Sequence, residues 1–271
     1  MTGAQFAAAV EEERLLEIYR ACFPEDGEAF WRWIFDRVYR PENTLVFREN
    51  GQITASLQMI PCQMRLGDRV LDAHYIYAAS TVPERQGRGL MGRLLELAAE
   101  EGRRREQAYS VLITQEDSLQ AYYARFGYRP RLLARFEQPQ GGAPDTARFC
   151  RRAEERDIPA LNELYEQAAA GMLHGVRDAA HWRMQLELFG AGAQVLERDG
   201  LVAAYAFSDE RGVMEAAGPE AAALAAYAAP REIWRTLPGP QDHPIGCIRP
   251  LNQWAGQLME QTVCFLNLMY N

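Results

Sequence analysis

A glycine-rich stretch that follows a predicted strand is the clearest chemical signal in the chain. Gly87 and Gly89 flank Arg88, and an amphipathic helix is predicted directly afterwards, over residues 89–104. Backbone N–H groups at a helix start lack helical partners and carry partial positive charge, so they favour anions. The glycines let a phosphate approach the backbone closely, and Arg88 can add a charge-assisted contact. The stretch therefore predicts a site for pyrophosphate.

Two common phosphate-binding motifs do not fit this stretch. A Walker loop ends in Gly-Lys-Ser/Thr, whereas every one of the 29 basic residues of this chain is Arg. The dinucleotide-binding fingerprint belongs in a first βαβ unit, whereas Gly87-Arg88-Gly89 follows a strand in the middle of a predicted domain. An ordinary tight turn is the structural alternative for both glycines.

A second chemical candidate lies on a predicted short helix over residues 118–126, which stops at Gly127. Tyr123 carries a phenol, whose ordinary pKa near 10 suits it to protonate a departing anion. Tyr122 is the weaker candidate beside it. Leu119, Tyr122, Tyr123 and Phe126 share helical spacing, so either ring could equally belong to the core.

Helices and strands alternate around these candidates in the first half of the chain. Apolar residues recur at helical spacing over residues 6–21 and again over 30–38. Strand-like runs at 44–48 and 53–60 flank Glu49-Asn50-Gly51, which is a hairpin signal. The remaining predicted elements are a strand at 71–82, the helix at 89–104, a strand at 109–114, the helix at 118–126 and a strand at 132–137.

The second half restarts this pattern after a stretch rich in Pro and Gly, residues 138–145, which predicts a linker. Helices are expected at 158–170 and from His181, followed by strand-like runs on either side of Asp199-Gly200. We interpret this as an internal repeat of two related domains, with chance similarity as the alternative. At the place equivalent to the glycine loop, Gly218-Pro219 leads straight into a helix, which leaves no phosphate nest there.

The loop and the tyrosine helix together resemble the GCN5-related N-acetyltransferases (GNAT), whose cofactor loop reads Gln/Arg-x-x-Gly-x-Gly/Ala. Gln86 and Gly89 match this loop, Met91 departs from it, and Tyr123 precedes Gly127-Tyr128 as in the family's Tyr-x-x-x-Gly-Phe/Tyr ending. Tandem members of the enhanced-intracellular-survival type share the departure at Met91 and pair a catalytic domain with a degenerate one. Their third, sterol-carrier-like domain is not expected within these 271 residues.

This resemblance implies an α/β (α+β) fold with tandem GNAT-like domains, each a mixed, mostly antiparallel sheet flanked by helices. Residues 1–137 would form the catalytic domain, 138–145 the linker and 146–271 the degenerate second domain. The implied cofactor is acetyl-CoA. The strand end at Ser80, Thr81 and Val82 would receive the pantetheine arm. The pyrophosphate would be held by the following residues: Gln86, Gly87, Arg88, Gly89, Leu90, Met91 and Gly92.

The implied reaction is acetyl transfer to a primary amine by direct attack in a ternary complex, with Tyr123 protonating the CoA thiolate. A base must take the proton of the ammonium. Glu116 and His74 are candidates, although Glu116 could simply be an acid at a helix start and His74 a satisfied strand histidine. In the tandem relatives the terminal carboxylate is the base, and Asn271 could supply it only if the tail folds back.

The acceptor pocket in this family is usually lined by the loop between the first two helices. In this chain that loop holds Glu25 and Asp26, and Trp31 follows. Acids beside an aromatic ring suit a cationic amine. A solvated acidic turn with a core Trp is the alternative.

Composition narrows the classes of partner. A net charge of −8 argues against nucleic acid, whose binders usually carry a basic surface, and favours cationic partners such as amines. No run approaches the ~18 apolar residues of a membrane span, so no membrane partner is expected. The N-terminus lacks a secretory signal, which indicates the cytoplasm. Five scattered cysteines without zinc spacing predict reduced thiols and no metal.

We therefore expect an acetyl-CoA-dependent N-acetyltransferase whose substrate is a small-molecule or peptide amine, with a homo-oligomer left open. A catalytically silent acyl-CoA-binding or regulatory module needs the same loop but not Tyr123. A different enzyme for a phosphate-bearing ligand is the third hypothesis.

Overall fold

The computed structural model describes residues 3–114, 117–138, 146–229, 234–236 and 243–267. Contacts divide the chain into two compact units, the first with Met1–Met64, Val70–Arg129 and Gly246–Glu260, and the second with Arg65–Arg69, Pro130–Ile245 and Gln261–Asn271. The predicted linker, 138–145, lies outside the described residues except for Gln138. The division into 1–137 and 146–271 stays a prediction. The first unit differs from 1–137 because it includes residues 246–260 and lacks residues 65–69 and 130–137.

The sheet of the first unit is mixed and mostly antiparallel, as predicted. Its strand order is β1 (Gly3–Phe6), β2 (Thr44–Glu49), β3 (Gln52–Leu66), β4 (Arg69–Thr81), β5 (Tyr109–Ile113) and β13 (His243–Pro250). The pairs β1–β2, β2–β3 and β5–β13 are antiparallel, whereas β4 and β5 run parallel. A parallel pair needs a crossover, which α3 (Leu90–Arg104) supplies.

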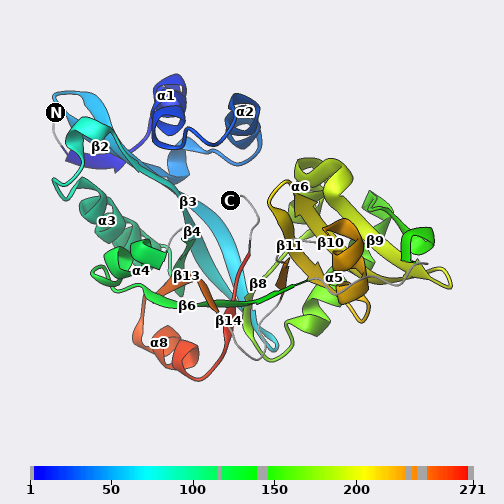
Figure 1. Ribbon diagram of the computed structural model, residues 1–271. Coiled ribbons are helices and arrows are strands. Elements are labelled where there is room, and N and C mark those ends of the chain that lie inside the picture. The colour runs from blue at the N-terminus through cyan, green and yellow to red at the C-terminus, as the bar shows by residue number, and fades with distance from the viewer. Residues whose placement is uncertain (1–2, 115–116, 139–145, 230–233, 237–242, 268–271) are drawn as a thin grey trace. The chain divides into compact units, whose positions relative to one another are not determined.

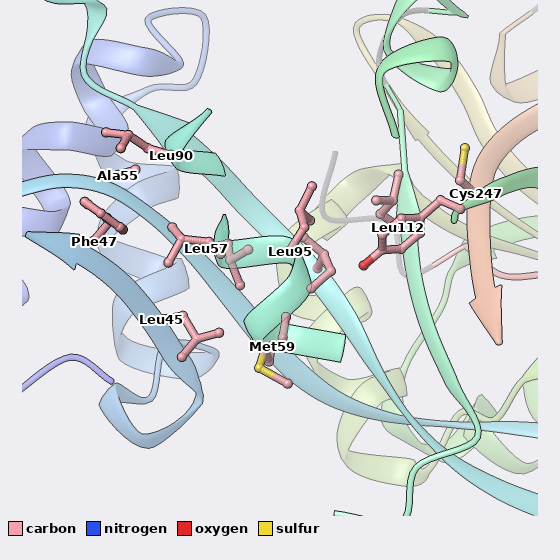
Figure 2. Close-up of a cluster of buried hydrophobic side chains, with 13 residues drawn as sticks. Leu45, Phe47, Ala55, Leu57, Met59, Leu90, Leu95, Leu112 and Cys247 are labelled. Carbon is pink, nitrogen blue, oxygen red and sulfur yellow. The ribbon is translucent and has the colours of Figure 1, made fainter. Parts of the chain in front are cut away.

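Helices cover both faces of this sheet because successive strand residues point to opposite sides. Leu57 and Met59 of β3 pack with Leu94 and Leu95 of α3 in one core cluster (Figure 2). On β4, Ile76 belongs to that cluster, whereas the ring of Tyr77 faces Trp31 of α2. The helices of the first unit are α1 (Glu12–Cys22), α2 (Glu28–Arg37), α3, α4 (Asp117–Ala124) and α8 (Gln253–Glu260) (Figure 1).

The N-terminal helix is shorter than the predicted 6–21, because α1 spans Glu12–Cys22 and residues 3–6 form β1. Gly3 pairs with Arg48 and Phe6 with Leu45, so Phe6, the first residue of the predicted helix, lies in the edge strand of the sheet. The hairpin prediction is confirmed. Asn50 and Gly51 have φ of 52° and 83°, the left-handed conformations that a two-residue turn with both central φ positive requires.

In the second unit the strand order is β6 (Arg129–Glu137), β12 (Trp234–Thr236), β11 (Gly212–Ala217), β10 (Leu201–Asp209), β9 (Ala193–Arg198) and β7 (Cys150–Arg152). A short strand near the C-terminus, β14 (Cys264–Phe265), runs parallel to β6 and to β8 (Leu173–Gly175). Its helices are α5 (Ile158–Ala168), α6 (Ala179–Phe189) and α7 (Ala221–Ala228).

The two units share an order of elements. The β9–β10 hairpin turns at Asp199 and Gly200, with φ of 49° and 78°, as β2–β3 turns at Asn50-Gly51. The strands β11 and β12 are parallel and are joined through α7, as β4 and β5 are joined through α3. Each parallel pair is extended by an antiparallel strand, β13 beside β5 and β6 beside β12.

Candidate functional site

The end of β4 separates from β5 before the glycine loop begins. Their pairing runs from Ala73 opposite Tyr109 to Tyr75 opposite Val111, whereas β4 continues to Thr81. Ala78 has a φ of 47°, a left-handed conformation that is uncommon for a residue other than glycine. Such an irregularity redirects a strand. The predicted site at Ser80, Thr81 and Val82 therefore has backbone groups on the side from which β5 has departed.

The other side of this strand end is firmly held by β3. The Val82 N–H donates to the Thr54 carbonyl at 3.0 Å. The buried hydroxyls of Ser56 and Ser80 are 2.9 Å apart. Ser56 was not predicted as part of the site. The sequence does indicate it, because Thr54 and Ser56 stand at alternate positions of a strand and so lie on the same, polar face.

The loop after β4 requires glycine for its backbone conformation. Gly87 and Gly89 both have a φ of 74°, and a Cβ atom added at either would meet nothing within 4 Å. The space above both residues is therefore open, so a ligand can approach the backbone. The Gln86 side chain donates its Nε2–H to the Thr81 carbonyl at 3.2 Å, which ties the loop to the end of β4.

The start of α3 offers unpaired N–H groups. Gly89 is the N-cap, no acidic residue stands in the first turn, and no side chain of the described residues caps it. The Arg93 N–H already donates to the Gly89 carbonyl at 3.2 Å, which leaves the N–H groups of Leu90, Met91 and Gly92 without helical acceptors. The exposed Arg88 adds positive charge beside them.

Two residues of this first turn also pack inward. A Cβ atom at Gly92 would lie 2.6 Å from a ring carbon of Phe126, so glycine lets the aromatic ring lie against the helix. Met91, where the resemblance expects a small residue, packs against the core cluster of the first unit.

The Tyr123 ring is half-buried against the same cluster, on the side of α4. The ring centroids of Tyr122 and Tyr128 lie 5.3 Å and 5.9 Å from its own. Burial raises the pKa of Tyr123 to about 12, so its phenol keeps its proton at neutral pH. Tyr122 instead lies under the guanidinium of Arg125, 4.6 Å from the ring centroid to Cζ.

Of the three candidate bases, the structure describes only His74. Glu116 and Asn271 lie outside the described residues. His74 is fully buried, its Nδ1 is 2.6 Å from Gln107 Oε1, and burial lowers its pKa to about 4. It stands seven residues before Thr81, or about 23 Å along an extended strand at ~3.3 Å per residue. Its position is that of a structural histidine.

The structure separates the predicted acceptor-binding residues. Glu25 is exposed and Asp26 half-buried in the turn between α1 and α2. Trp31 is 1% exposed and packs in an aromatic core, 5.2 Å from Tyr19 between ring centroids. The packing role, which the sequence left as an alternative, is therefore the one that its position favours.

The turn with Glu25 and Asp26 begins close to the end of β4. Cys22, the last residue of α1, has its thiol sulfur 3.6 Å from the Thr81 carbonyl oxygen. The acidic turn thus starts beside the same strand end from which the glycine loop departs. Cys22 was not predicted at the site, and its position depends on a contact between residues far apart in sequence.

Two classes of feature are not found in the part of the chain that the structure describes. No helix there is both long and apolar enough to cross a membrane. No group of three or more His, Cys, Asp or Glu side chains there could hold a metal ion.

Comparison with known proteins finds similar solved structures, three of which follow, and one family model. A GCN5-related N-acetyltransferase from Kribbella flavida aligns with a TM-score of 0.67 at 16% identity, over 94% of this chain and 73% of that one. Eis1 from Mycobacterium abscessus aligns at 0.62 and 16%, over 92% and 74%. The N-myristoyltransferase of Saccharomyces cerevisiae, with bound myristoyl-CoA, aligns at 0.55 and 10%, over 92% and 77%. No curated protein matches the sequence.

At these identities the solved structures establish the fold. The family evidence comes from the sequence, since residues 5–131 match the model of the Acetyltransferase (GNAT) domain. That range includes the strand end, the glycine loop, α3 and the tyrosine helix. The match spans just under half of the chain, so residues 5–131 are similar to an acetyltransferase domain of the GNAT family, and this similarity together with the fold supports an enzyme of the acyltransferase class.

Proposed function

We propose that the chain transfers an acetyl group from acetyl-CoA to a primary amine by direct attack in a ternary complex. The main support for this proposal is that a strand end, a glycine loop and a helix start follow one another directly and form one site. The end of β4 parts from β5 and leads through Gly87–Gly89 into the uncapped start of α3. An extended backbone followed by a cluster of free N–H groups suits a pantetheine arm followed by a pyrophosphate.

Different residues of this site would contact different parts of the cofactor. Ser80, Thr81 and Val82 would bond to the pantetheine amides through their backbone groups, and Gln86 would keep the loop against the strand. The N–H groups from Gly87 to Gly92, with Arg88, would hold the pyrophosphate. Bound acetyl-CoA supplies a thioester, whose carbonyl carbon accepts the amine and whose thiolate leaves. Tyr123, protonated at neutral pH, would then donate its proton to the leaving sulfur.

The acceptor would be a small-molecule or peptide amine that enters beside the turn with Glu25 and Asp26. The two carboxyl side chains of this turn, which starts beside the end of β4 at Cys22, would attract an ammonium group. Glu116 remains the proposed base, with the terminal carboxylate of Asn271 as its alternative. We keep the cytoplasm as the proposed location.

We further propose that the chain is a tandem GNAT protein whose second domain, residues 146–271, has lost its cofactor site. The shared order of elements in the two units supports the tandem reading. Gly218 leads directly to α7, and a Cβ atom there would lie 2.5 Å from the Ala203 carbonyl oxygen. The N-cap of α7 is Glu220, whose carboxylate bonds to Arg198 at 3.0 Å. This start has neither the open space nor the charge that a phosphate needs.

Calorimetric titration of the full chain with CoA and acetyl-CoA tests the proposal. We expect one binding site per chain, which Gly89→Glu should abolish by placing a carboxylate at the pyrophosphate position. Gly200→Glu is the matched control, because Gly200 has a similar φ of 78° and equally open space but lies in the second unit. Equal affinity in the parent and in Gly89→Glu would refute the site. Binding without turnover of any amine would favour the silent module.

A further inference from the structure

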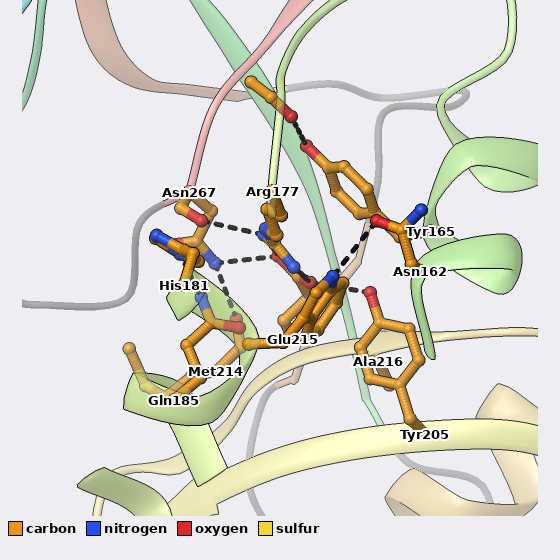
Figure 3. Close-up of polar contacts among 12 residues, drawn as sticks. Asn162, Tyr165, Arg177, His181, Gln185, Tyr205, Met214, Glu215, Ala216 and Asn267 are labelled. Atoms are coloured by element: carbon orange, nitrogen blue, oxygen red, sulfur yellow. Dashed lines mark hydrogen bonds and ion pairs between the residues drawn. The ribbon is translucent and has the colours of Figure 1, made fainter. Parts of the chain in front are cut away.

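A buried cluster in the second unit surrounds the side chain of Arg177, which is 1% exposed (Figure 3). The two terminal nitrogens of Arg177 donate to the two carboxylate oxygens of Glu215, at 2.6 Å and 2.7 Å. One of these nitrogens also donates to the Asn267 carbonyl at 2.7 Å. The planar guanidinium therefore meets a planar carboxylate in the bidentate geometry that suits both groups.

Two aromatic rings complete the surroundings of this guanidinium. The Cζ atom of Arg177 lies 4.0 Å from the ring centroid of Tyr165 and 5.0 Å from that of Trp182. The two rings are inclined to each other by 80°, with centroids 6.1 Å apart, so they form a corner beside the cation. A cation near an aromatic face is attracted most strongly where water is excluded. Two buried rings and a carboxylate are thus the components of a cation-binding cage.

We propose that Tyr165, Trp182 and Glu215 form a binding site for an alkylguanidinium ion, which the chain's own Arg177 occupies as an internal ligand. The site should take up a free alkylguanidinium ion once the Arg177 side chain is removed. The alternative is an ion pair that serves only to fill the core, which no free ion would replace selectively. The site itself does not depend on the proposed acetyl transfer.

The rings of the cage are held by hydrogen bonds that do not involve Arg177. The Tyr165 hydroxyl donates to the Gly175 carbonyl at 2.7 Å, and Trp182 donates its Nε1–H to Asn162 Oδ1 at 3.1 Å. Both rings are 0% exposed. They should therefore keep their positions when the Arg177 side chain is shortened, and a site that is already organised binds its ligand at a lower cost.

The carboxylate of the cage is also held without Arg177. The Tyr205 hydroxyl donates to Glu215 Oε1 at 2.8 Å, and Asn267 donates its Nδ2–H to Glu215 Oε2 at 3.1 Å. Removal of the Arg177 side chain therefore leaves a fixed, buried negative charge. Such a charge is costly without a partner, so it strongly favours the entry of a cation of the right shape.

The order of elements relates this cage to the first unit. Arg177 lies between α5 and α6, as the turn with Glu25 and Asp26 lies between α1 and α2, and Glu215 lies on β11, which leads into α7 as β4 leads into α3. Under the proposed function, that turn of the first unit admits a cationic amine. At the corresponding place the second unit carries its own cation, so the parent chain should bind no free guanidinium ion there.

Thermal unfolding of the full-length Arg177→Ala variant tests the proposal. The atoms that this variant lacks are those of N-ethylguanidinium, so this ion is the probe, and N-ethylammonium and sodium are compared at equal ionic strength. The measurement is made at pH 8, above the ordinary pKa of histidine, to keep the neighbouring His181 neutral. N-ethylguanidinium at about ten times its Kd should raise the Tm of the variant by roughly 3–6 °C and leave that of the parent unchanged.

Two control variants separate the cage from general effects of the ion. Arg177→Ala combined with Glu215→Leu lacks the carboxylate, so its Tm should not respond to N-ethylguanidinium. Arg183→Ala removes one partner of the exposed pair with Glu155 and should not respond either. If Arg177→Ala does not fold alone, its refolding yield in each ion takes the place of the Tm, and selective recovery in N-ethylguanidinium supports the site.

Three results would overturn the proposal. The first is a Tm or refolding yield of Arg177→Ala that N-ethylguanidinium does not raise. The second is an equal effect of N-ethylammonium, because the cage would then not recognise a guanidinium group. The third is an equal response of the double variant. None of these results concerns CoA, whose binding tests the proposed function separately.

Discussion

The buried ion pair between Arg177 and Glu215 should be among the most costly side-chain pairs to break in the second unit. The two side chains are 1% and 0% exposed, and their bidentate contacts measure 2.6 Å and 2.7 Å (Figure 3). Arg177 also donates to the Asn267 carbonyl at 2.7 Å, and Tyr205 donates its hydroxyl to Glu215 at 2.8 Å. Replacing one partner leaves the other charge buried without compensation.

The expected loss is set by that uncompensated charge. Arg177→Met leaves a buried carboxylate, which costs about 3–5 kcal/mol of unfolding free energy. Glu215→Leu leaves a buried guanidinium and should cost a similar amount. In the double variant no charge is left buried without a partner. The remaining cost is the loss of one partner each by the Tyr205 hydroxyl, the Asn267 carbonyl and the Asn267 side chain, at about 1–3 kcal/mol for each lost partner. The double variant should therefore be much more stable than the sum of the single losses implies.

Urea unfolding followed by circular dichroism measures all three variants against the parent. Arg183→Met is the matched control, because Arg183 and Glu155 form an exposed pair in the same unit, at 3.2 Å with 55% and 73% of the side chains accessible. That control should lose less than about 1 kcal/mol. Single variants of the buried pair that lose no more than the control, or a double variant whose loss is the sum of both, would refute the reasoning.

Three further changes test other parts of the structure. Tyr123→Phe should lower kcat on the order of a hundredfold with an unchanged Kd for CoA, because the variant loses only the proton donor; an unchanged kcat in steady-state assays would make the ring structural. Burial lowers the pKa of His74 to about 4, against 6.5 in the unfolded chain, so the neutral ring's full contribution to the free energy of unfolding is present above pH 6.5 and up to about 3 kcal/mol of it is lost as the pH falls toward 4. In urea unfolding between pH 6.5 and 4, His74→Gln should make the free energy of unfolding less dependent on pH, and an unchanged pH dependence would contradict the assignment. Truncation after Thr262 removes Phe265 and Leu266, both 0% exposed, so the Tm should fall by many degrees; a tail that only dangles would leave it unchanged.

Local features of the sequence predicted the parts of the fold that depend on neighbouring residues. Asn50-Gly51 predicted a turn because few other residues adopt positive φ at both positions, and the hairpin forms there. The start of α3 was placed to within one residue by its glycines. In both cases the backbone conformation is decided within a few residues of the signal.

The features that the sequence did not predict depend on distant contacts. Residues 3–6 became a strand because β2 offered an edge to pair with, and residues 246–260 joined the first unit because β13 pairs with β5. For Trp31 the sequence left a core position and an acceptor-binding one as alternatives, and contacts with Tyr19 and Tyr77 on other elements place it in the core. The partner of Arg177 is 38 residues away on β11, and no local pattern marks it.

The glycines before α3 and before α7 have different structural roles. Gly218 is needed before α7 because the backbone of β10 fills the place where a Cβ would stand, 2.5 Å from the Ala203 oxygen. Gly87 and Gly89 are needed before α3 for their φ alone, and the space beside them is open. Glycine thus allows close packing of protein against protein at α7 and access to the backbone at α3. A phosphate needs both unpaired N–H groups and room to reach them, so the open arrangement before α3 suits a phosphate and the filled one before α7 does not.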